Sequence, residues 1–383
     1  MATVHVTDLI EVLSRMPMLS PLKSAVNSDI DLFLCASGFE QRVEAAAKAL
    51  RRQRISAKMA CYYTYNQNEP ENASMRQGLL KSLNKISSSV SSLDGDARGA
   101  KFRRSLDRTF RQLDTTLNEQ RSDYEPLVVF DISCASTSLI LRTLPLLWER
   151  DIRLVIAYTQ SATYFPTAQE YSDVATGVPN PTPADMGMQS ADVDNDAADP
   201  EFMFENPGIH LDNLPDRVIV IAGFSGRRCN TALAYVDPAL TVEHPNPRVS
   251  WIAGQPAARR DRWRLQTMLK VNSLLSNRKP IDSVRIVSRQ DYRDTLRVLE
   301  DDYNKYSLTE KITVAAMGSK MQTVAVALFC ELHPDVRVVL AGPATHEGRH
   351  YSSGVRTTWG LDLGSAAELR SALASIGQAS LQE

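Results

Sequence analysis

The 383-residue sequence lacks several features that define common protein classes. Its five cysteines are odd in number and none forms a CxxC pair, so we expect reduced thiols rather than a disulfide framework. No apolar run approaches the roughly 20 residues of a membrane-spanning helix. Residues 7–15 fit a short amphipathic helix rather than a signal peptide. These absences predict a cytoplasmic protein with no membrane segment.

An excess of charge of either sign is also missing. The 43 Lys and Arg residues nearly balance the 45 Asp and Glu residues. A general coat of nucleic acid or a polybasic membrane surface is therefore not expected, although local basic patches are compatible with this balance. The sequence contains neither GxxxxGK nor GxGxxG, which argues against P-loop nucleotide hydrolysis and against dinucleotide binding.

Apolar segments alternate with amphipathic ones along most of the chain. DLFLCA (residues 31–36), LVVFDI (127–132) and ITVAA (312–316) are apolar throughout, which is typical of strands covered on both faces of a sheet. Strand–helix alternation predicts the α/β class with mostly parallel sheets. We predict four parts: an N-terminal helical segment (1–26), a first α/β unit (27–159), a Pro-rich acidic linker or loop (160–216) and a second α/β unit (217–383).

The second half of the sequence repeats features of the first. ASGFEQR around Gly38 reappears as IAGFSGRR around Gly223, and at the same spacing Arg42 falls on Arg227. We interpret the repeat as an internal duplication, which predicts two similar Rossmann-like units. The predicted helices at 75–90 and 101–118 correspond to those at 257–275 and 291–306.

Four turns of the predicted units are candidate ligand sites. Ligands of an open parallel sheet bind beyond the carboxyl ends of its strands, near a switch point of the strand order. GFEQR, SCASTS, GFSGRR and MGSKMQ fall there, each with Gly or Ser at a predicted helix N-terminus, which favours a phosphate group. The candidate residues are Gly38, Glu40, Arg42, Ser133, Ser136, Gly223, Arg227, Gly318, Ser319, Lys320 and Gln322.

Several of these residues also have a purely structural interpretation. Ser319 can simply cap its helix, and Lys320 can be a solvated first-turn residue rather than a phosphate ligand. Asp131, at the end of LVVFD, can contact a ribose hydroxyl or a base amine, or can cap the following helix. Glu40 and Arg42 form either a site pair or an ordinary ion pair. Both interpretations stay open for each residue.

A polar loop near the C-terminus offers further candidate ligands. HEGRH (residues 346–350) has the histidine spacing of the zinc-binding HExxH helix, but the neighbouring proline, glycines and serines oppose a helix there. We therefore expect neither a metal nor a cofactor. Arg349, His350 and Tyr351 instead offer hydrogen-bond donors and a stacking face for a ligand.

Two segments are rich in arginine with interleaved aromatic residues. They are RGAKFRRSLDRTFRQ (residues 98–112) and ARRDRWRLQTMLK (residues 258–270). The solvated face of an amphipathic helix explains both segments, and contact with a phosphate-rich ligand or a nucleic acid is the alternative explanation.

The turn Gly318-Ser319-Lys320, set between a buried strand and a helix, resembles the ligand turn of CARF domains, which are CRISPR-associated sensors of cyclic oligonucleotides. Two such units in one chain resemble the SAVED domain of antiphage systems, a fused CARF pair. In architecture the resemblance covers most of the chain, but in motif only residues 316–323. The first copy, Ser133 to Ser136, lacks the lysine.

The resemblance implies an antiphage-defence-type sensor or complex subunit. It would hold a nucleotide second messenger, a cyclic oligonucleotide, between two Rossmann-like halves, with Ser319 and Lys320 on phosphate, and would signal to a separate effector protein. One alternative is a phosphate-handling enzyme that uses Asp131, Glu40, His346, His350 and Lys320 on nucleotides or nucleic acid. Another is a scaffold subunit that touches nucleic acid. The sequence contains no complete catalytic constellation, which favours binding.

Overall fold

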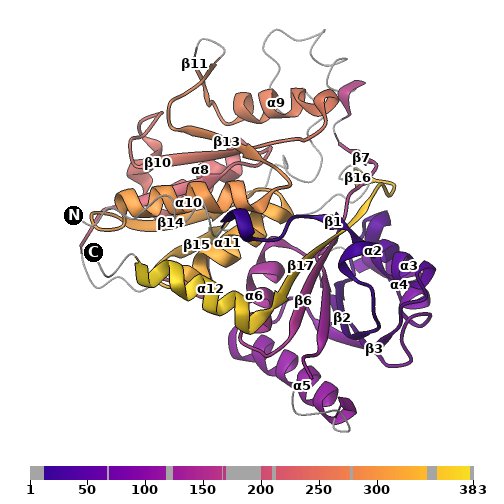
Figure 1. Ribbon diagram of the computed structural model, residues 1–383. Helices are drawn as coiled ribbons and strands as arrows, with labels where there is room; N and C mark the ends of the chain where they lie inside the picture. The colour runs from indigo at the N-terminus through magenta and orange to yellow at the C-terminus, as the bar shows by residue number, and fades with distance from the viewer. Residues whose placement is uncertain are drawn as a thin grey trace. The chain divides into compact units, whose positions relative to one another are not determined.

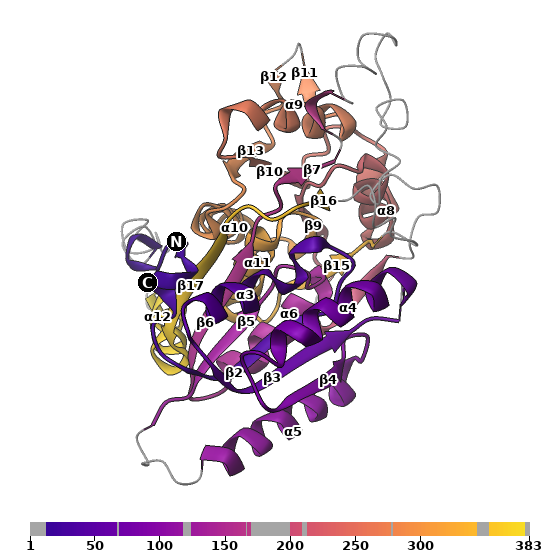
Figure 2. The same cartoon turned by 90° about the vertical axis from the view of Figure 1, so that its right-hand side faces the viewer.

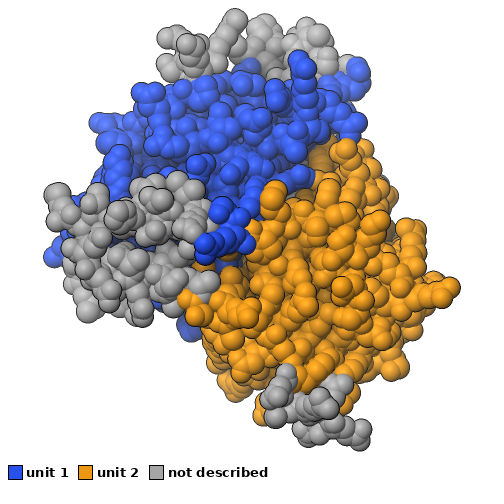
Figure 3. Space-filling model, viewed as in Figure 1, with its two compact units in different colours: residues 1–15, 165–350, 375–383 blue, residues 16–164, 351–374 orange. Residues whose placement is uncertain are grey.

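The computed structural model describes residues 13–66, 69–117, 124–165, 167–169, 200–208, 213–276, 279–342 and 352–379. The chain divides into two compact units (Figure 3). Unit 2 consists of residues 16–164 and 351–374, and unit 1 of residues 1–15, 165–350 and 375–383. In the described part of the chain, no helix is long and apolar enough to cross a membrane.

Unit 2 is built on a seven-stranded sheet in the order β1-β17-β6-β5-β2-β3-β4 (Figure 1). Strands β6, β5, β2, β3 and β4 pair in parallel, whereas β17 is antiparallel to both β6 and β1. The strands are β1 (Ser20–Pro21), β2 (Ile30–Ala36), β3 (Ala57–Thr64), β4 (Val90–Asp94), β5 (Leu127–Asp131), β6 (Arg153–Thr159) and β17 (Thr358–Ser365).

Helices cover both faces of this sheet, which explains why β2 and β5 are buried along their whole length. On one face Phe33 and Cys35 pack against α3 and α4. On the other face the ring of Tyr63 stacks on Phe102 of α5, with 5.7 Å between ring centroids. The helices are α2 (Leu22–Ala25), the 3-10 turn η1 (Gln41–Glu44), α3 (Ala45–Arg52), α4 (Glu69–Leu83), α5 (Gly99–Leu117), α6 (Thr137–Trp148) and the part of α12 (Ala366–Ala379) up to residue 374.

Unit 1 is built on a six-stranded sheet in the order β13-β10-β9-β14-β15-β8. All neighbours pair in parallel except β15 and β8, which are antiparallel. The strands are β8 (Glu201–Pro207), β9 (Asp216–Ile221), β10 (Val249–Gln255), β13 (Val284–Ser288), β14 (Lys311–Ala316) and β15 (Arg337–Leu340). The helical elements are α8 (Gly226–Val236), η2 (Pro238–Thr241), η3 (Arg259–Asp261), α9 (Trp263–Val271), α10 (Tyr292–Tyr306) and α11 (Lys320–Leu332).

The two sheets share one strand order. When the five parallel strands of each sheet are numbered in chain order, the first lies between the second and the fourth, and an antiparallel strand lies beside the fifth. The predicted α/β class with mostly parallel sheets is confirmed. The shared order is what an internal duplication would produce, and the common origin itself stays a prediction.

Some predicted boundaries and helices differ from the structure. The sequence assigned all of residues 217–383 to the second unit, but β17 pairs with β6, so residues 351–374 belong to unit 2. The stretch predicted as a linker (160–216) contains β8, an edge strand of unit 1. The helix predicted at 75–90 ends at Leu83, and β4 begins at Val90. The long helix predicted at 257–275 is shorter, because η3 precedes α9.

Candidate functional site

Each sheet has a switch point between its first and fourth strands, β2 and β5 in unit 2 and β9 and β14 in unit 1. Ligands of open parallel sheets bind at the carboxyl edge near such a point. The four candidate turns lie there, because each follows one of these four strands directly. The predicted residues are therefore brought together as two groups, one in each unit.

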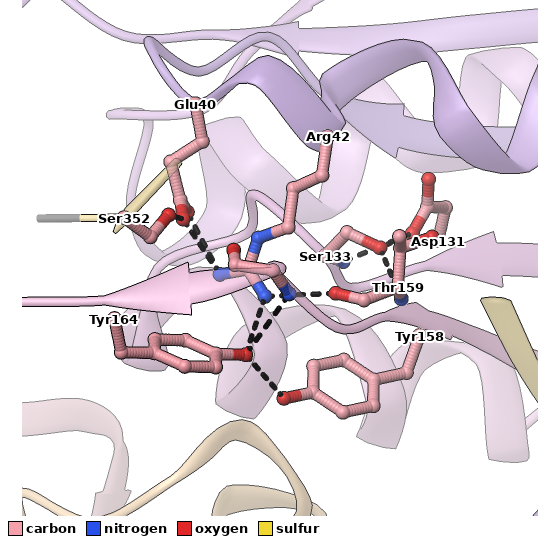
Figure 4. Close-up of polar contacts among 9 residues, drawn as sticks. Glu40, Arg42, Asp131, Ser133, Tyr158, Thr159, Tyr164 and Ser352 are labelled. Atoms are coloured by element: carbon pink, nitrogen blue, oxygen red, sulfur yellow. Dashed lines mark hydrogen bonds and ion pairs between the residues drawn. The ribbon is translucent and has the colours of Figure 1, made fainter. Parts of the chain in front are cut away.

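A buried ion pair dominates the carboxyl edge in unit 2. Glu40 and Arg42 have side chains only 6% and 2% exposed, and Arg42 Nη2 lies 2.8 Å from Glu40 Oε2 (Figure 4). Arg42 Nη1 also donates to the carbonyl oxygen of Thr159 at 2.8 Å. Burial alone would lower the pKa of Arg42, but the Glu40 carboxylate raises it well above its ordinary value. The Arg42 guanidinium therefore stays charged inside the protein.

Residues from distant parts of the chain complete the network around this pair. Ser352 donates a hydrogen bond to Glu40. Tyr164 accepts from Arg42 Nη1 at 3.4 Å, and its hydroxyl lies 3.3 Å from that of Tyr158. Arg42 thus links the turn after β2 to β6 and to the two-stranded antiparallel sheet of β7 (Thr163–Tyr164) and β16 (Ser352–Ser353). These contacts favour the ion-pair interpretation of Glu40 and Arg42 over the ligand-facing one.

Asp131 and Ser133 belong to the same network. Asp131 Oδ1 accepts hydrogen bonds from both the backbone N–H, at 2.9 Å, and the hydroxyl of Ser133. The Ser133 hydroxyl in turn accepts from the N–H of Thr159 at 2.8 Å. Asp131 and Ser133 are buried, so they hold the turn after β5 against the end of β6.

Ser136, at the start of α6, also has a structural role. The Ser136 hydroxyl caps α6 by accepting from the N–H of Leu139 at 3.1 Å, and the Ser136 N–H donates to the Tyr65 hydroxyl at 2.9 Å. A Cβ on Gly38 would lie 2.9 Å from the Cβ of Cys134, closer than real Cβ contacts allow. Gly38 is therefore required where the two turns at the switch point touch.

In unit 1 the Gly-Ser-Lys turn forms a complete capping box at the start of α11. The Ser319 hydroxyl accepts from the N–H of Gln322 at 3.3 Å, and Gln322 Oε1 accepts from the N–H of Ser319 at 2.9 Å. The Ser319 hydroxyl also donates to the Arg289 carbonyl oxygen at 2.8 Å. The capping role of Ser319 is confirmed. Lys320 lies half-buried in the first turn of the helix.

Gln322 is the unusual member of this group. Its side chain is only 2% exposed, and its Nε2 has no hydrogen-bond partner in the part of the chain that the structure describes. A Cβ on Gly254, at the end of β10, would lie 3.3 Å from Nε2. A Cβ on Gly318 would lie 2.7 Å from Oε1 of the same amide and 2.4 Å from Ile221 Cγ2. Two glycines therefore make room for a buried amide whose donor group is unsatisfied, which is a costly arrangement without a ligand or water.

A second helix begins beside this turn. Ser225 caps α8 by accepting from the N–H of Arg228 at 3.3 Å, and Arg227 is exposed in the first turn. A Cβ on Gly223 would lie 2.8 Å from the carbonyl oxygen of Met317, so the turns after β9 and β14 are in direct contact. Because β9 and β14 are parallel neighbours, both helix N-termini lie at one sheet edge.

The remaining predicted ligand and metal residues do not contribute to either of these two groups. Arg349, His350, Tyr351 and the HEGRH motif fall outside the described residues. Within the ranges that the structure describes, no three His, Cys, Asp or Glu side chains are grouped for a metal ion. All five cysteines are buried and none forms a disulfide, and burial raises the pKa of Cys229 to about 11 and of Cys330 to about 12.

Sequence reasoning missed Thr159, Tyr164 and Ser352 in unit 2. The sequence position of Thr159 and Tyr164 could have identified them, because both come after the carboxyl end of a predicted buried strand. Ser352 carries no local signal, since its partner Glu40 is 312 residues away. Gln322 could be selected only as part of the turn, and its buried amide is a property of the tertiary structure.

Comparisons with known proteins identify no family for this chain. No protein-family model matches the chain, and no curated protein matches it. A solved crystal structure of UDP-N-acetylglucosamine 2-epimerase is 10% identical, covers 80% of this chain and 88% of its own, and has a TM-score of 0.20. A similarity at that level carries no argument about function.

Proposed function

We propose that the chain is a binding protein for a nucleotide-derived signal, such as a cyclic oligonucleotide, and that it signals to a separate effector protein. The ligand would lie at the carboxyl edge of the unit 1 sheet. The site comprises the N-termini of α8 and α11, with Ser319 and Gln322 positioning the turn and Lys320 and Arg227 supplying positive charge.

The observation that carries this proposal is the buried amide of Gln322. Its Nε2 is a donor without a partner among the described residues, at the edge where α8 and α11 begin. Helix N-termini favour anions through their outward N–H groups and the positive end of the helix dipole. Two helix ends, a lysine and an unsatisfied donor at one edge support a ligand with phosphate and hydrogen-bond-accepting groups.

The contacts in unit 2 support binding over turnover. Glu40 and Asp131 are the two carboxylates among the five residues of the enzyme hypothesis, and both are buried and hydrogen-bonded within the protein. His346 and His350 of that hypothesis lie outside the described residues. A general base must reach the proton it abstracts from a substrate. Neither carboxylate has that access in this arrangement.

The test is thermal unfolding of the wild type and of Lys320→Ala with cyclic di-, tri- and tetranucleotides. At 100 times its Kd a ligand adds about 2.7 kcal/mol of stability, which raises the midpoint by a few degrees. We expect the wild type to shift and Lys320→Ala to lose most of the shift. Lys270→Ala, an exposed lysine in the last turn of α9, is the matched control and should shift like the wild type. No shift with any of the nucleotides would overturn the proposal.

A further inference from the structure

Helix α5 presents a row of positive charge to solvent. Arg98, just before the helix, and Lys101, Arg104, Arg108 and Arg111 within it are all exposed. They are spaced three or four residues apart, so they share one helix face. The row extends over about 20 Å at the rise of an α-helix.

The opposite face of α5 is firmly packed, which fixes the direction of this row. Phe102, Leu106, Phe110 and Leu113 are buried. Helix α5 lies at the side of β3 and β4 opposite to α4 (Figure 2). The guanidinium of Arg150 lies 4.1 Å from the ring centroid of Phe110 and fixes the helix further. The row therefore cannot rotate toward the interior.

Three of the five basic side chains in this row have no ion-pair partner among the described residues. Lys101 pairs with Asp94 at 2.9 Å, but Arg104, Arg108 and Arg111 form no ion pair with any described residue. Like charges three or four residues apart on a helix repel one another. A polyanion lying along α5 would relieve this repulsion over three turns.

We infer that α5 is a contact surface for the phosphate backbone of a nucleic acid. Among the described residues, no exposed large apolar side chain belongs to α5. This helix face therefore has no apolar anchor for a protein or a membrane. Successive phosphates of a duplex strand advance about 3.4 Å along the axis, so the row can face several of them. Because the contacts are to backbone phosphates, binding depends on salt and has little sequence preference.

The other arginine-rich segment, residues 258–270, does not form such a row. The 3-10 turn η3 and helix α9 divide it, and Arg264 is buried with Nη2 donating to the Phe165 carbonyl oxygen at 3.0 Å. Arg259, Arg260 and Arg262 are exposed and lie outside the regular helix. Their replacement changes the net charge by the same amount as replacement of Arg104, Arg108 and Arg111.

The experiment measures fluorescence anisotropy of labelled 20-base-pair DNA and RNA duplexes titrated with the full chain at several salt concentrations. The test variant is Arg104→Gln/Arg108→Gln/Arg111→Gln, and the charge-matched control is Arg259→Gln/Arg260→Gln/Arg262→Gln. Loss of three phosphate contacts should reduce the slope of log K against log salt by about 2.7 on DNA. We expect at least a tenfold loss of affinity at low salt in the test variant, less than twofold in the control, and an unchanged thermal midpoint in both.

Three results would overturn the inference. These are no binding by the wild type at 50 mM salt, an equal loss in both triple variants, or displacement of the duplex by polyglutamate or phosphatidylserine vesicles as readily as by unlabelled DNA. The last would identify an acidic protein or a membrane surface as the partner. The inference is independent of the proposed nucleotide site, because Lys320→Ala should leave duplex binding unchanged.

Discussion

Replacement of Arg42 by methionine tests whether the network at the carboxyl edge of unit 2 is structural. Methionine keeps much of the aliphatic volume but removes every hydrogen bond of the guanidinium. Glu40, whose side chain is 6% exposed in the wild type, would then lack its cation, with the Ser352 hydroxyl as its remaining side-chain donor among the described residues. The carbonyl oxygen of Thr159 and the hydroxyl of Tyr164 would also lose a donor.

The expected loss of stability is large. Breaking a buried ion pair by removing one partner costs about 3–5 kcal/mol, because a buried charge is left uncompensated. For a unit of roughly 150–250 residues each kcal/mol lowers the melting temperature by about 2–4 °C. Arg42→Met should therefore lower the midpoint of unit 2 by roughly 6–20 °C. Glu40→Gln/Arg42→Met should be more stable than Arg42→Met alone, since it contains no unpaired buried charge.

Differential scanning calorimetry of both variants and of a control measures these differences. The control is Arg103→Met, which breaks an ion pair with Glu149 whose side chains are 50% and 49% exposed. Exposed pairs contribute about 0–1 kcal/mol, so this variant should melt within a few degrees of the wild type. If Arg42→Met melts no lower than Arg103→Met, or if adding Glu40→Gln gives no recovery, the network does not stabilise the fold as argued.

Two further predictions concern unit 1. Gly318→Ala should cost about 1–3 kcal/mol in thermal unfolding, because its Cβ would lie 2.4 Å from Ile221 Cγ2, whereas Gly342→Ala meets nothing within 4 Å and should be nearly neutral. The hydrogen bond from Arg293 lowers the pKa of the Asp291 carboxyl group, although burial acts in the opposite direction. The ionised carboxylate therefore stabilises the fold at pH values above its ordinary pKa. This stabilisation is lost as the pH falls through the lowered pKa. Asp291→Asn, which keeps a helix-capping oxygen, should lose about 1 kcal/mol at pH 7 and less at pH 2 in urea unfolding, and an equal loss at both pH values would contradict this assignment.

Local patterns in the sequence are sufficient for the central elements. Ile30–Ala36 and Leu127–Asp131 are apolar throughout because helices cover both faces of their sheet, and this pattern identified them as buried parallel strands. The helices predicted at 101–118 and 291–306 match α5 and α10 closely, since each buries one stripe of its surface.

Local sequence patterns did not predict the strands at the edges of the sheets. β4 and β8 are only partly buried, so their apolar pattern is weak. β17 contains two glycines and a register shift between Asp362 and Gly364, and its partner β6 lies about 200 residues earlier in the chain. Such strands are defined by the neighbour with which they pair, and no window of local sequence contains that neighbour.

By itself the sequence determined the α/β class, the strands of the two sheet centres and the turns at their carboxyl ends. It also determined that Ser319 could cap α11, because a cap depends on residues three positions apart. Only the tertiary structure decided that Glu40 and Arg42 are enclosed by β6 and β16, while the amide of Gln322 stays without a partner among the described residues. The physical reason is that backbone conformation follows local sterics and periodic burial, whereas the partners of a polar side chain come from segments that only folding brings together.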